Sequence, residues 1–441
     1  MRNRLLLLGL TITAWLALTV IDFVLPWPAI CVLLSATLLI MICHTFWLLH
    51  AQRSDRRKLK VNNAGSTWRP SVDILIPAKN ESRVIERTVR GFAKLDYPDF
   101  KIWVIDDASD DQTPEILERL KKEIPNFNYI QRPVGSYPGK SAGLNDALPH
   151  CRAEVIAVFD ADASVAPDFL TRILPVLEPE GVGAVQAQKR IYTHQKGFLP
   201  NCQASEYALD TYFQVGRDLI GGAVELRGNG ELMKRQALID VGGWTNKSIT
   251  DDLDLTMKLL LAKWDVRFSP DTEVWEEAVT TLKGLMRQRR RWAEGSIRRY
   301  LDYIFPLNSP SRLSLVERLD ILAFLSEFAI PGLMVLEIMS ESISFLTGGP
   351  THPKFLLMVA LLAYLISMVN FFISMRFYRK DLSAARAFVH MFEVNTYVYA
   401  HWVPCVLISF INIAFKRQAS TWHRTEHGVA EAAHVLSTAD R

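Results

Sequence analysis

The sequence predicts an α/β protein, with a catalytic domain built on a Rossmann-like, mostly parallel sheet and flanked by transmembrane helices. In the centre of the 441-residue chain, short β-rich runs alternate with helical patterns, which is typical of a parallel sheet covered by helices. The apolar residues concentrate at the two ends of the chain, in stretches of about 20 residues that can span a bilayer. Polar residues follow several predicted strands, where α/β sheets bind their ligands.

Composition narrows the classes of protein to which this chain can belong. With 22% charged and 49% hydrophobic residues, it is neither disordered nor an ordinary soluble protein. The net charge of +3 is too small to indicate nucleic acid as a partner. The five cysteines form no C-x-x-C pair and no cluster with histidine, so we expect neither a structural zinc site nor a disulfide framework. Such a chain fits a catalytic portion that faces the cytosol.

We expect residues 1–50 to form a transmembrane hairpin. Two apolar stretches, 5–21 and 29–49, each have about the length that a membrane-spanning helix needs. The first could instead be a secretory signal peptide, but no small-x-small cleavage site follows it. Arginine and lysine are dense in the linker 51–70, which marks the cytoplasmic side of a membrane. The central domain would therefore begin in the cytoplasm.

The catalytic domain is predicted over residues 71–280. Its strands are short runs rich in apolar and β-branched residues, and helical patterns separate them. The predicted strands cover 72–78, 101–107, 127–132, 154–160 and 182–188. The first predicted helix ends near residue 95, and two more cover 113–123 and 167–178.

Polar side chains follow four of these strands, and we expect them to meet at one edge of the sheet. They are Asn80 and Glu81 after the first strand, Asp107 after the second, Lys140 after the third, and Asp160 and Asp162 after the fourth. The paired carboxylates Asp160 and Asp162 suit Mg²⁺ or Mn²⁺ with substrate phosphates. Lys140 would add a positive charge for the same diphosphate, and Asp107 could accept hydrogen bonds from a base or ribose. A lone D-x-D is more often a solvated turn, but here the other strand ends are polar too.

A second acidic group begins the helix predicted at residues 249–256, with Thr250 as its expected N-cap. One carboxylate of this group could face the crevice and deprotonate an acceptor hydroxyl, because an inverting transfer needs one general base. Alternatively, Asp251 and Asp254 complement the positive end of the helix dipole.

Residues 281–315 are predicted to form a basic amphipathic segment at the membrane interface. A basic amphipathic helix commonly lies on an anionic membrane surface, and this explains most of its arginines. It does not explain the pattern formed by Gln288, Arg291 and Trp292, which we interpret as part of the site.

Residues 316–416 should contain transmembrane or interfacial helices, followed by a polar tail over 417–441. The three apolar stretches are about 319–346, 354–375 and 388–415. The first carries Glu327, Glu337 and Glu341, which are costly inside a bilayer. These carboxylates either line a polar path for the acceptor or lie on an interfacial helix that keeps them wet, and the number of crossings stays open.

The ordered motifs resemble the membrane-embedded family 2 glycosyltransferases, which have a GT-A fold. The resemblance covers about residues 70–305 and rests on an acidic strand end, D-x-D, a T-E-D box that here reads Thr250-Asp251-Asp252, and Q-x-x-R-W. It implies Asp252 as general base and Asp162, helped by Asp160, as metal ligand. It also implies uridine contacts from Asn80, Glu81 and Asp107, and an acceptor and diphosphate site at Gln288, Arg291 and Trp292.

A narrower resemblance points to a lipid acceptor. Residues 225–230, 249–256 and 291–303 resemble the cyanobacterial β-monoglucosyldiacylglycerol synthases within that family. This implies UDP-glucose as donor, 1,2-diacylglycerol as acceptor and a multi-pass membrane protein with a cytoplasmic catalytic domain. Two alternatives stay open: a processive polysaccharide synthase that uses a UDP-sugar, and a membrane scaffold with an inactive transferase domain.

Overall fold

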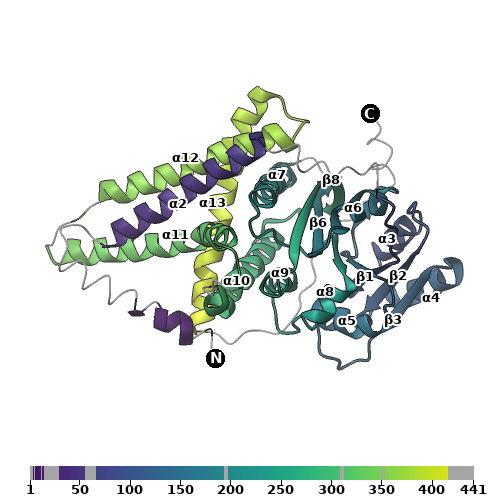
Figure 1. The fold of residues 1–441 in the computed structure, drawn as a ribbon. Helices are drawn as coiled ribbons and strands as arrows, with labels where there is room; N and C mark the ends of the chain where they lie inside the picture. The colour runs from purple at the N-terminus through teal and green to yellow at the C-terminus, as the bar shows by residue number, and fades with distance from the viewer. Residues whose placement is uncertain are drawn as a thin grey trace.

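The computed structural model describes residues 3, 5–10, 12–13, 29–54, 66–192, 197–307, 312–348, 351 and 353–415. Most of the first predicted membrane segment, most of the basic linker and the tail 417–441 lie outside the described residues. The described chain forms an α/β domain beside a bundle of long helices (Figure 1).

The α/β domain is built on one eight-stranded sheet with the order β3-β2-β1-β4-β7-β6-β8-β5. Strands β1 to β4 pair in parallel, as do β6 and β8, whereas β7 is antiparallel to both of its neighbours and β5 is antiparallel to β8. The strands are β1 (Val72–Ala78), β2 (Phe100–Asp106), β3 (Phe127–Gln131), β4 (Val155–Val158), β5 (Ser164–Val165), β6 (Val182–Tyr192), β7 (Glu231–Lys234) and β8 (Asp265–Glu277).

Apolar runs explain the central strands, because a sheet covered on both faces buries nearly every strand residue. All four residues of β4 are buried, and so are six of the seven residues of β1. The five predicted strands correspond to β1, β2, β3, β4 and β6, so the mostly parallel α/β fold is confirmed. The prediction missed β5, β7 and β8. The first two have two and four residues, which is too short for a recognisable period.

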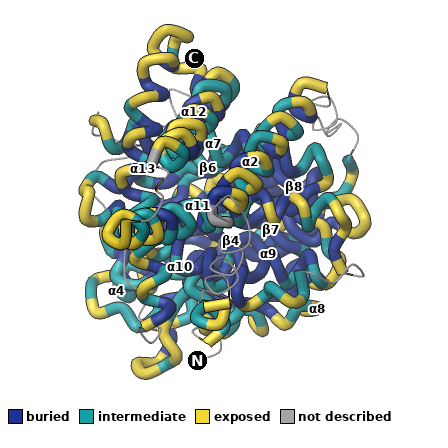
Figure 2. Tube along the Cα trace, turned by 90° about the vertical axis from the view of Figure 1, so that its left-hand side faces the viewer, coloured by how far each residue is buried: buried dark blue, intermediate teal, exposed yellow. Residues whose placement is uncertain are grey.

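Helices cover both faces of the sheet. One core contains residues of α3 (Ile85–Phe92), α4 (Thr113–Glu123) and α6 (Phe169–Leu177), and these three helices agree with the predicted ones. The opposite core contains residues of α5 (Lys140–Ala147), α8 (Arg235–Asp240), α9 (Asp251–Leu261) and α10 (Leu282–Leu307). A short 3₁₀ helix, η3 (Leu148–His150), follows α5. Figure 2 shows the deeply buried residues gathered in this sheet region.

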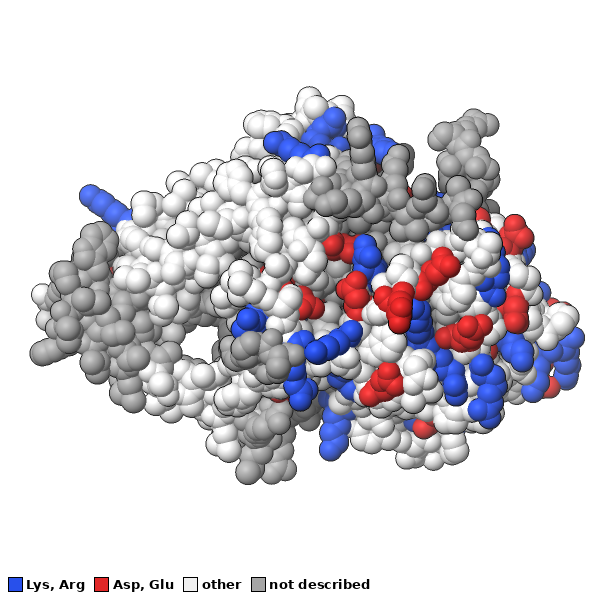
Figure 3. Space-filling view, in the orientation of Figure 1, with Lys and Arg blue, Asp and Glu red and all other residues white. Residues whose placement is uncertain are grey.

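Four described helices are long and apolar enough to cross a membrane: α2 (Ala29–Ser54), α11 (Leu315–Leu346), α12 (Pro353–Tyr378) and α13 (Ala384–Phe415). Helix α2 continues four residues into the predicted linker. The first C-terminal stretch, despite its three glutamates, is as continuous a helix as the other two. Figure 3 shows charged side chains over the α/β domain and an almost uncharged surface over the bundle.

Two helices join the bundle to the α/β domain. The sequence did not predict α7 (Phe198–Ile220), which packs against α12 and α2, while α10 packs along α13. Helices α7 and α10 therefore lie between the sheet and the candidate membrane spans (Figure 1).

Candidate active site

The carboxyl ends of β1 and β2 and the first turn of α5 enclose a small pocket. Its lining residues are Pro77, Ala78, Ile105, Asp107, Gly139, Lys140 and Gly143. Gly143 allows α5 to approach β2 closely, because a Cβ at this position would lie 3.2 Å from Cγ2 of Ile105. A mostly apolar pocket with one acid and one lysine suits a planar base attached to charged groups.

Three groups hold Asp107 in this pocket. The guanidinium group of Arg132 donates to Oδ1, the backbone N–H of Gly139 donates to Oδ2 over 3.2 Å, and Nζ of Lys79 lies 3.9 Å from Oδ2. Arg132 is buried and also donates to Asp146 over 2.9 Å. Asp107 lies at the strand end where the sequence predicts it, whereas Arg132, which directly follows β3, was not predicted as part of the site.

Asn80 and Glu81 lie where the chain leaves β1, and their hydrogen bonds join that turn to the loop after β2. The N–H of Asn80 donates to Oγ of Ser109 over 2.8 Å, and its side-chain oxygen accepts from the N–H of Asp110 over 2.9 Å. The N–H of the buried Glu81 donates to Oγ1 of Thr113 over 2.9 Å. These bonds fix the two strand ends relative to each other, and a direct role in donor binding stays a prediction.

Lys140, the first residue of α5, connects the pocket to the D-x-D turn. Its Nζ donates to Oδ1 of Asp160 over 2.7 Å and to the carbonyl oxygen of Gly228 over 2.5 Å. Burial disfavours the charged carboxylate, but Lys140, Lys189 and Arg291 together hold the pKa of Asp160 below its ordinary value. Both members of this ion pair are therefore charged.

Asp162 is directed toward the end of β8, where its Oδ2 accepts a hydrogen bond from the N–H of Glu277 over 3.0 Å. Asp162 is 6% exposed, whereas the side chain of Asp160 is 42% exposed. Such a pair fits a hard cation that takes one or two protein carboxylates and completes its shell with phosphate oxygens and water. Within the described ranges, no three His, Cys, Asp or Glu side chains gather around a metal position by themselves.

Asp252, the second residue of α9, lies beside the same lysine. A Cβ built at Gly228 would lie 3.2 Å from Oδ2 of Asp252 and 3.5 Å from Nζ of Lys140. Lys140 and Asp252 therefore lie beside Gly228, and Lys140 also contacts Asp160. Burial and the neighbouring Asp251 raise the pKa of Asp252 to about 6. A carboxylate with this pKa is ionised at neutral pH and can still accept a proton, as a general base must.

Glu231, at the start of β7, is a further acid of this site that the sequence analysis missed. Its Oε2 accepts a hydrogen bond from the N–H of Gly228 over 3.1 Å. Burial raises the pKa of Glu231 to about 8, and Asp252 and Asp251 act in the same direction against Lys140. Glu231 is thus mainly neutral at pH 7, so it adds no further negative charge beside Asp251 and Asp252.

The loop formed by residues 225–230 connects these groups through its backbone. Gly228 has a φ of +75°, a conformation that favours glycine, and its carbonyl oxygen accepts from Lys140. The side-chain oxygen of Asn229 accepts a hydrogen bond from the N–H of Asp160 over 3.2 Å. The 225–230 loop therefore fixes both the lysine and the first carboxylate of the D-x-D pair.

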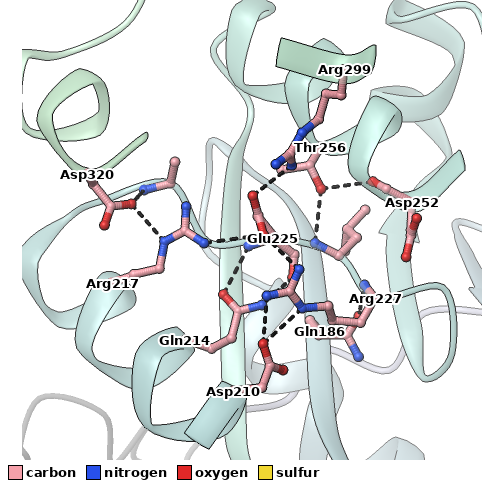
Figure 4. Close-up of polar contacts among 12 residues, drawn as sticks. Gln186, Asp210, Gln214, Arg217, Glu225, Arg227, Asp252, Thr256, Arg299 and Asp320 are labelled. Carbon is pink, nitrogen blue, oxygen red and sulfur yellow. Dashed lines mark hydrogen bonds and ion pairs between the residues drawn. The ribbon is translucent and has the colours of Figure 1, made fainter. Parts of the chain in front are cut away.

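The same loop is fixed to α9 and β6 (Figure 4). The N–H of Leu226 donates to Oγ1 of Thr256 over 2.9 Å, and that hydroxyl donates to the carbonyl oxygen of Asp252 over 2.9 Å. The N–H of Arg227 donates to the side-chain oxygen of Gln186 over 2.7 Å. Any shift of the loop would therefore shift Asp252 with it.

Glu225, the first residue of this loop, forms the centre of a buried ionic cluster. It pairs with three arginines from three parts of the chain, namely Arg217 of α7 at 3.4 Å, Arg227 of the loop at 2.7 Å and Arg299 of α10 at 2.7 Å. These cations outweigh the effect of burial and hold the pKa of Glu225 well below its ordinary value. Glu225 therefore stays ionised while fully enclosed in protein.

Two further pairs extend this cluster toward the helix bundle. Arg227 pairs with Asp210 of α7 at 2.6 Å, and Arg217 pairs with Asp320 of α11 at 2.7 Å. Nε2 of His44, on α2, lies 2.8 Å from Oδ1 of Asp320. The cluster thus joins two candidate membrane helices to the loop that holds Lys140 and Asp160. The sequence analysis missed it because its members are far apart in the chain.

The Q-x-x-R-W residues lie on α10. The side-chain oxygen of Gln288 accepts from Arg289 over 2.6 Å, and the Arg289 guanidinium lies 4.0 Å from the ring centroid of Trp292. Arg289 is buried and pairs with Glu206 at 2.6 Å, so it fixes Trp292 against α7. Arg291 is close enough to the D-x-D turn to lower the pKa of its first carboxylate. Arg289 was counted among the basic residues, but its anchoring role was missed.

The expectation that Thr250 caps α9 was only half right. Thr250 occupies the N-cap position, but its side chain makes no capping hydrogen bond. It packs instead against Gly295 of α10, where any Cβ would clash with it. Asp254 accepts a hydrogen bond from the hydroxyl of Tyr303 over 3.0 Å, so this acid ties α9 to α10. Asp254 therefore has a structural contact that the sequence did not predict, its complement to the helix dipole stays a prediction, and Asp252 lies beside Gly228.

Known proteins resemble this chain in sequence and in fold. β-Monoglucosyldiacylglycerol synthases of Trichormus variabilis and Nostoc sp. are each 38% identical over 365 residues, which cover 81% of this chain and 76% of theirs. The synthase of the same name from Synechocystis sp. is 40% identical over 295 residues, which cover 65% of this chain and 62% of its own. A mannosyltransferase from Pyrobaculum calidifontis, solved with GDP-Man and Mn²⁺, aligns with a TM-score of 0.61 at 20% identity and covers 87% of this chain and 99% of its own, which supports the GT-A fold.

The family assignment rests on more than half of the chain. Residues 70–295 match the family described as glycosyltransferase-like family 2, and this segment contains β1 to β8 together with Asp107, Asp160, Asp162 and Asp252. Two of the synthases above extend the likeness beyond this segment, because they align over 81% of this chain. The chain therefore belongs to glycosyltransferase family 2.

Proposed function

We propose that this chain transfers glucose from UDP-glucose to 1,2-diacylglycerol and makes β-monoglucosyldiacylglycerol with inversion at the anomeric carbon. The observation that carries the proposal is that Lys140 contacts both Asp160 and Gly228, and that Asp252 lies beside the same glycine. This arrangement brings a charge for the diphosphate, a carboxylate for a metal and a general base to one place. The names of the relatives at 38–40% identity support the sugar and the acceptor.

The donor nucleotide would occupy the pocket at the ends of β1 and β2. Asp107 can accept hydrogen bonds from a base N–H or a ribose hydroxyl, and Arg132 fixes its orientation. Asn80 and Glu81 would complete this end of the donor site, where they hold the loop after β2. Lys140 would place its charge beside the diphosphate.

Asp162, helped by Asp160, would hold Mg²⁺ or Mn²⁺. The bound ion would supply positive charge that offsets the negative charge on the departing UDP. The partial exposure of Asp160 and the two-carboxylate set agree with a cation that shares its shell with substrate phosphates.

In the chemical step, Asp252 removes the proton of the acceptor hydroxyl while that oxygen forms a bond to C1 of glucose. The bond between C1 and the diphosphate oxygen breaks, and UDP leaves with the electron pair. The hydroxyl attacks from the face opposite UDP, so an α-linked donor gives a β-linked product. Lys140 and Arg291 stabilise the charge that develops on the diphosphate.

The acceptor would approach from the bilayer side, past α10. Gln288, Arg291 and Trp292 lie on this helix, which packs along the candidate membrane helix α13. We place the protein in the membrane as a multi-pass protein with its α/β domain in the cytoplasm, because the linker that precedes this domain is rich in Arg and Lys.

The test is to incubate membranes that contain the protein with UDP-[¹⁴C]glucose and dioleoylglycerol. We expect label in a chloroform-soluble lipid. A β-glucosidase, but not an α-glucosidase, should release labelled glucose from this lipid. Label in an ethanol-insoluble polymer would instead identify a processive synthase. A protein that releases no UDP with any donor or lipid would be an inactive scaffold. The Asp252→Asn variant, purified in parallel, measures the background.

A further inference from the structure

Glu327 lies inside α11, one of the four helices that can span a membrane. Carboxyl groups in such a helix are costly and usually face a polar partner or a ligand. Glu337, further along, has a partner, because Sγ of Cys31 lies 3.6 Å from its Oε1. Within the described part of the chain, no hydrogen bond or ion pair engages the Glu327 side chain.

The helical period places Glu327 on the face of α11 that meets the α/β domain. Asp320, Phe324 and Glu327 are spaced four and three residues apart, so they lie on one face of the helix. Asp320 pairs with Arg217 at 2.7 Å, and the Phe324 ring centroid lies 4.8 Å from the guanidinium carbon of Arg217. Glu327 is the next group along this face.

Aromatic rings from three helices surround the next turn. The ring of Phe328 lies 5.9 Å from that of Tyr300 on α10 and 5.7 Å from that of Trp402 on α13. Tyr399, also on α13, interacts electrostatically with Glu327. Aromatic side chains of α10, α11 and α13 therefore lie near Glu327, a setting that suits the apolar part of a lipid.

The ionic cluster does not need Glu327 for its own neutrality. Glu327 interacts electrostatically with this cluster. Its three arginines are already matched by three carboxylates, the members being Arg217, Arg227, Arg299, Asp210, Glu225 and Asp320. Of these arginines, Arg227 also interacts electrostatically with Asp252. Arg227 thus interacts electrostatically with both Asp252 and Glu327.

Arg227 has hydrogen-bonding capacity to spare. A guanidinium group carries five N–H donors. Its Nε and Nη2 each donate to Asp210, over 3.1 and 2.6 Å, and its Nη1 donates to Glu225 over 2.7 Å. Both terminal nitrogens therefore keep a second N–H for a ligand. A diacylglycerol offers two ester carbonyl oxygens as acceptors, next to the hydroxyl that must reach Asp252.

We propose that Glu327 and Arg227 bind the glycerol backbone of the acceptor lipid through its ester carbonyl oxygens. Arg227 donates from its remaining N–H groups, and the Glu327 carboxyl group donates when it carries a proton. The two contacts hold the backbone between the aromatic rings and Asp252, with the free hydroxyl toward the sugar. This inference rests on the proposed function and names the part of the acceptor that the enzyme recognises, its ester carbonyl oxygens.

The test compares two acceptors of equal chain length, 1,2-dioleoylglycerol and its 1,2-dioleyl diether, which lacks the carbonyl oxygens. The full-length enzyme is assayed in mixed micelles as wild type, Glu327→Leu and Glu327→Gln. The matched control is Glu341→Leu on the same helix, about 21 Å further along at 1.5 Å per residue. UDP-glucose binding to each variant reports whether the variant is folded.

We expect the wild type to prefer the diester by about 10- to 100-fold in kcat/KM, since each of the two hydrogen bonds contributes up to about tenfold. Glu327→Leu should reduce this preference about tenfold, because only Arg227 then donates to the lipid, while its KM for UDP-glucose stays within about twofold of wild type. Glu327→Gln, which keeps a donor, and Glu341→Leu should both retain it.

Two results would overturn the inference: a wild type that uses both lipids equally, or a leucine variant that keeps the full preference. Loss of the preference in Glu327→Gln to the same extent as in leucine would also contradict it, because the amide still donates. If the wild type glucosylates no diacylglycerol at all, the proposed function itself fails. If it does so and only the preference is absent, the proposed function stands and this inference fails.

Discussion

At the scale of single residues, the site uses carboxyl groups whose surroundings give them different tasks. Burial and Asp251 raise the pKa of Asp252 to about 6, so this group can exchange a proton near neutral pH. Burial acts on Asp160 in the same direction, but Lys140 overcomes it and keeps this group anionic. One aspartate is thus suited to proton transfer and the other to holding a cation.

The pKa of Asp252 predicts the acid limb of the pH profile. Since the base must be ionised, kcat should fall about tenfold per pH unit below pH 6. The effect on folding has the opposite sign. Between pH 3.8 and about 6 the folded state keeps a proton that the unfolded state has lost, so this group stabilises the fold less as pH rises. Steady-state rates from pH 5 to 8 test the first statement, and a profile flat down to pH 5 would exclude Asp252 as the titrating base.

Glu231 supplies a contrasting prediction. Burial raises its pKa to about 8, so at pH 7 it is mainly a neutral acid and Glu231→Gln should keep kcat within about threefold of wild type. Glu231→Ala removes the acceptor of the Gly228 N–H and should cost much more activity. The comparison is made at saturating donor and acceptor. A glutamine variant as poor as alanine would show that the ionised form of Glu231 is required.

Sequence motifs identified those site residues that are close to one another in the chain or that follow predicted strands. Asp107, Asp160 and Asp162 could be found because each follows a buried strand, and Asp252 because it begins a helix. Arg132 escaped notice because its role depends on Asp107, 25 residues away. Glu231 escaped notice because the charged groups that act on its pKa, Lys140, Asp251 and Asp252, belong to other elements. A single sequence carries no sign of such pairings.

At the scale of elements, apolar runs sufficed for the parallel strands and for the helices between them. They did not identify β7, whose four residues pair antiparallel between β4 and β6. They also missed α7, which holds Asp210 and Arg217 and faces both the sheet and the bundle. The string 225–230 contributed to the family resemblance, but the sequence did not predict that this loop forms hydrogen bonds with Lys140 and Asp160.

The loop should be the most sensitive element of the domain. Glu225→Gln leaves three buried arginines facing only Asp210 and Asp320, and should destabilise the folded protein by about 3–5 kcal/mol. Thermal unfolding in detergent measures the loss.

The control is Glu123→Gln, which breaks a half-exposed pair with Arg90 and should cost less than about 1 kcal/mol. Equal costs for the two substitutions would mean that the Glu225 cluster contributes no more than a surface pair.

At the scale of the whole molecule, the site is built on the sheet and is also connected to the helix bundle by buried ion pairs. Asp320 of α11 contacts both His44 of α2 and Arg217 of α7, and Arg217 contacts Glu225 at the base of the loop. The sequence predicted both the α/β domain and the apolar ends. It could not predict that polar residues inside the apolar segments join them.

The proposed topology places the α/β domain in the cytoplasm. A cysteine introduced at Lys121, on the exposed side of α4, should react with a membrane-impermeant maleimide only after cells are lysed. The natural Cys151 and Cys202 are buried and should give little background. Labelling in intact cells would place the domain on the outer side.

The most direct measurement is the turnover of Asp252→Asn beside its affinity for UDP-glucose. Because this change removes the base and leaves the pocket at Asp107 and Lys140 intact, donor affinity should stay within about threefold while kcat falls by about 10²–10⁴. A variant that keeps more than a few per cent of wild-type turnover, or that loses donor binding along with it, would contradict the assignment of Asp252 as the base beside Gly228.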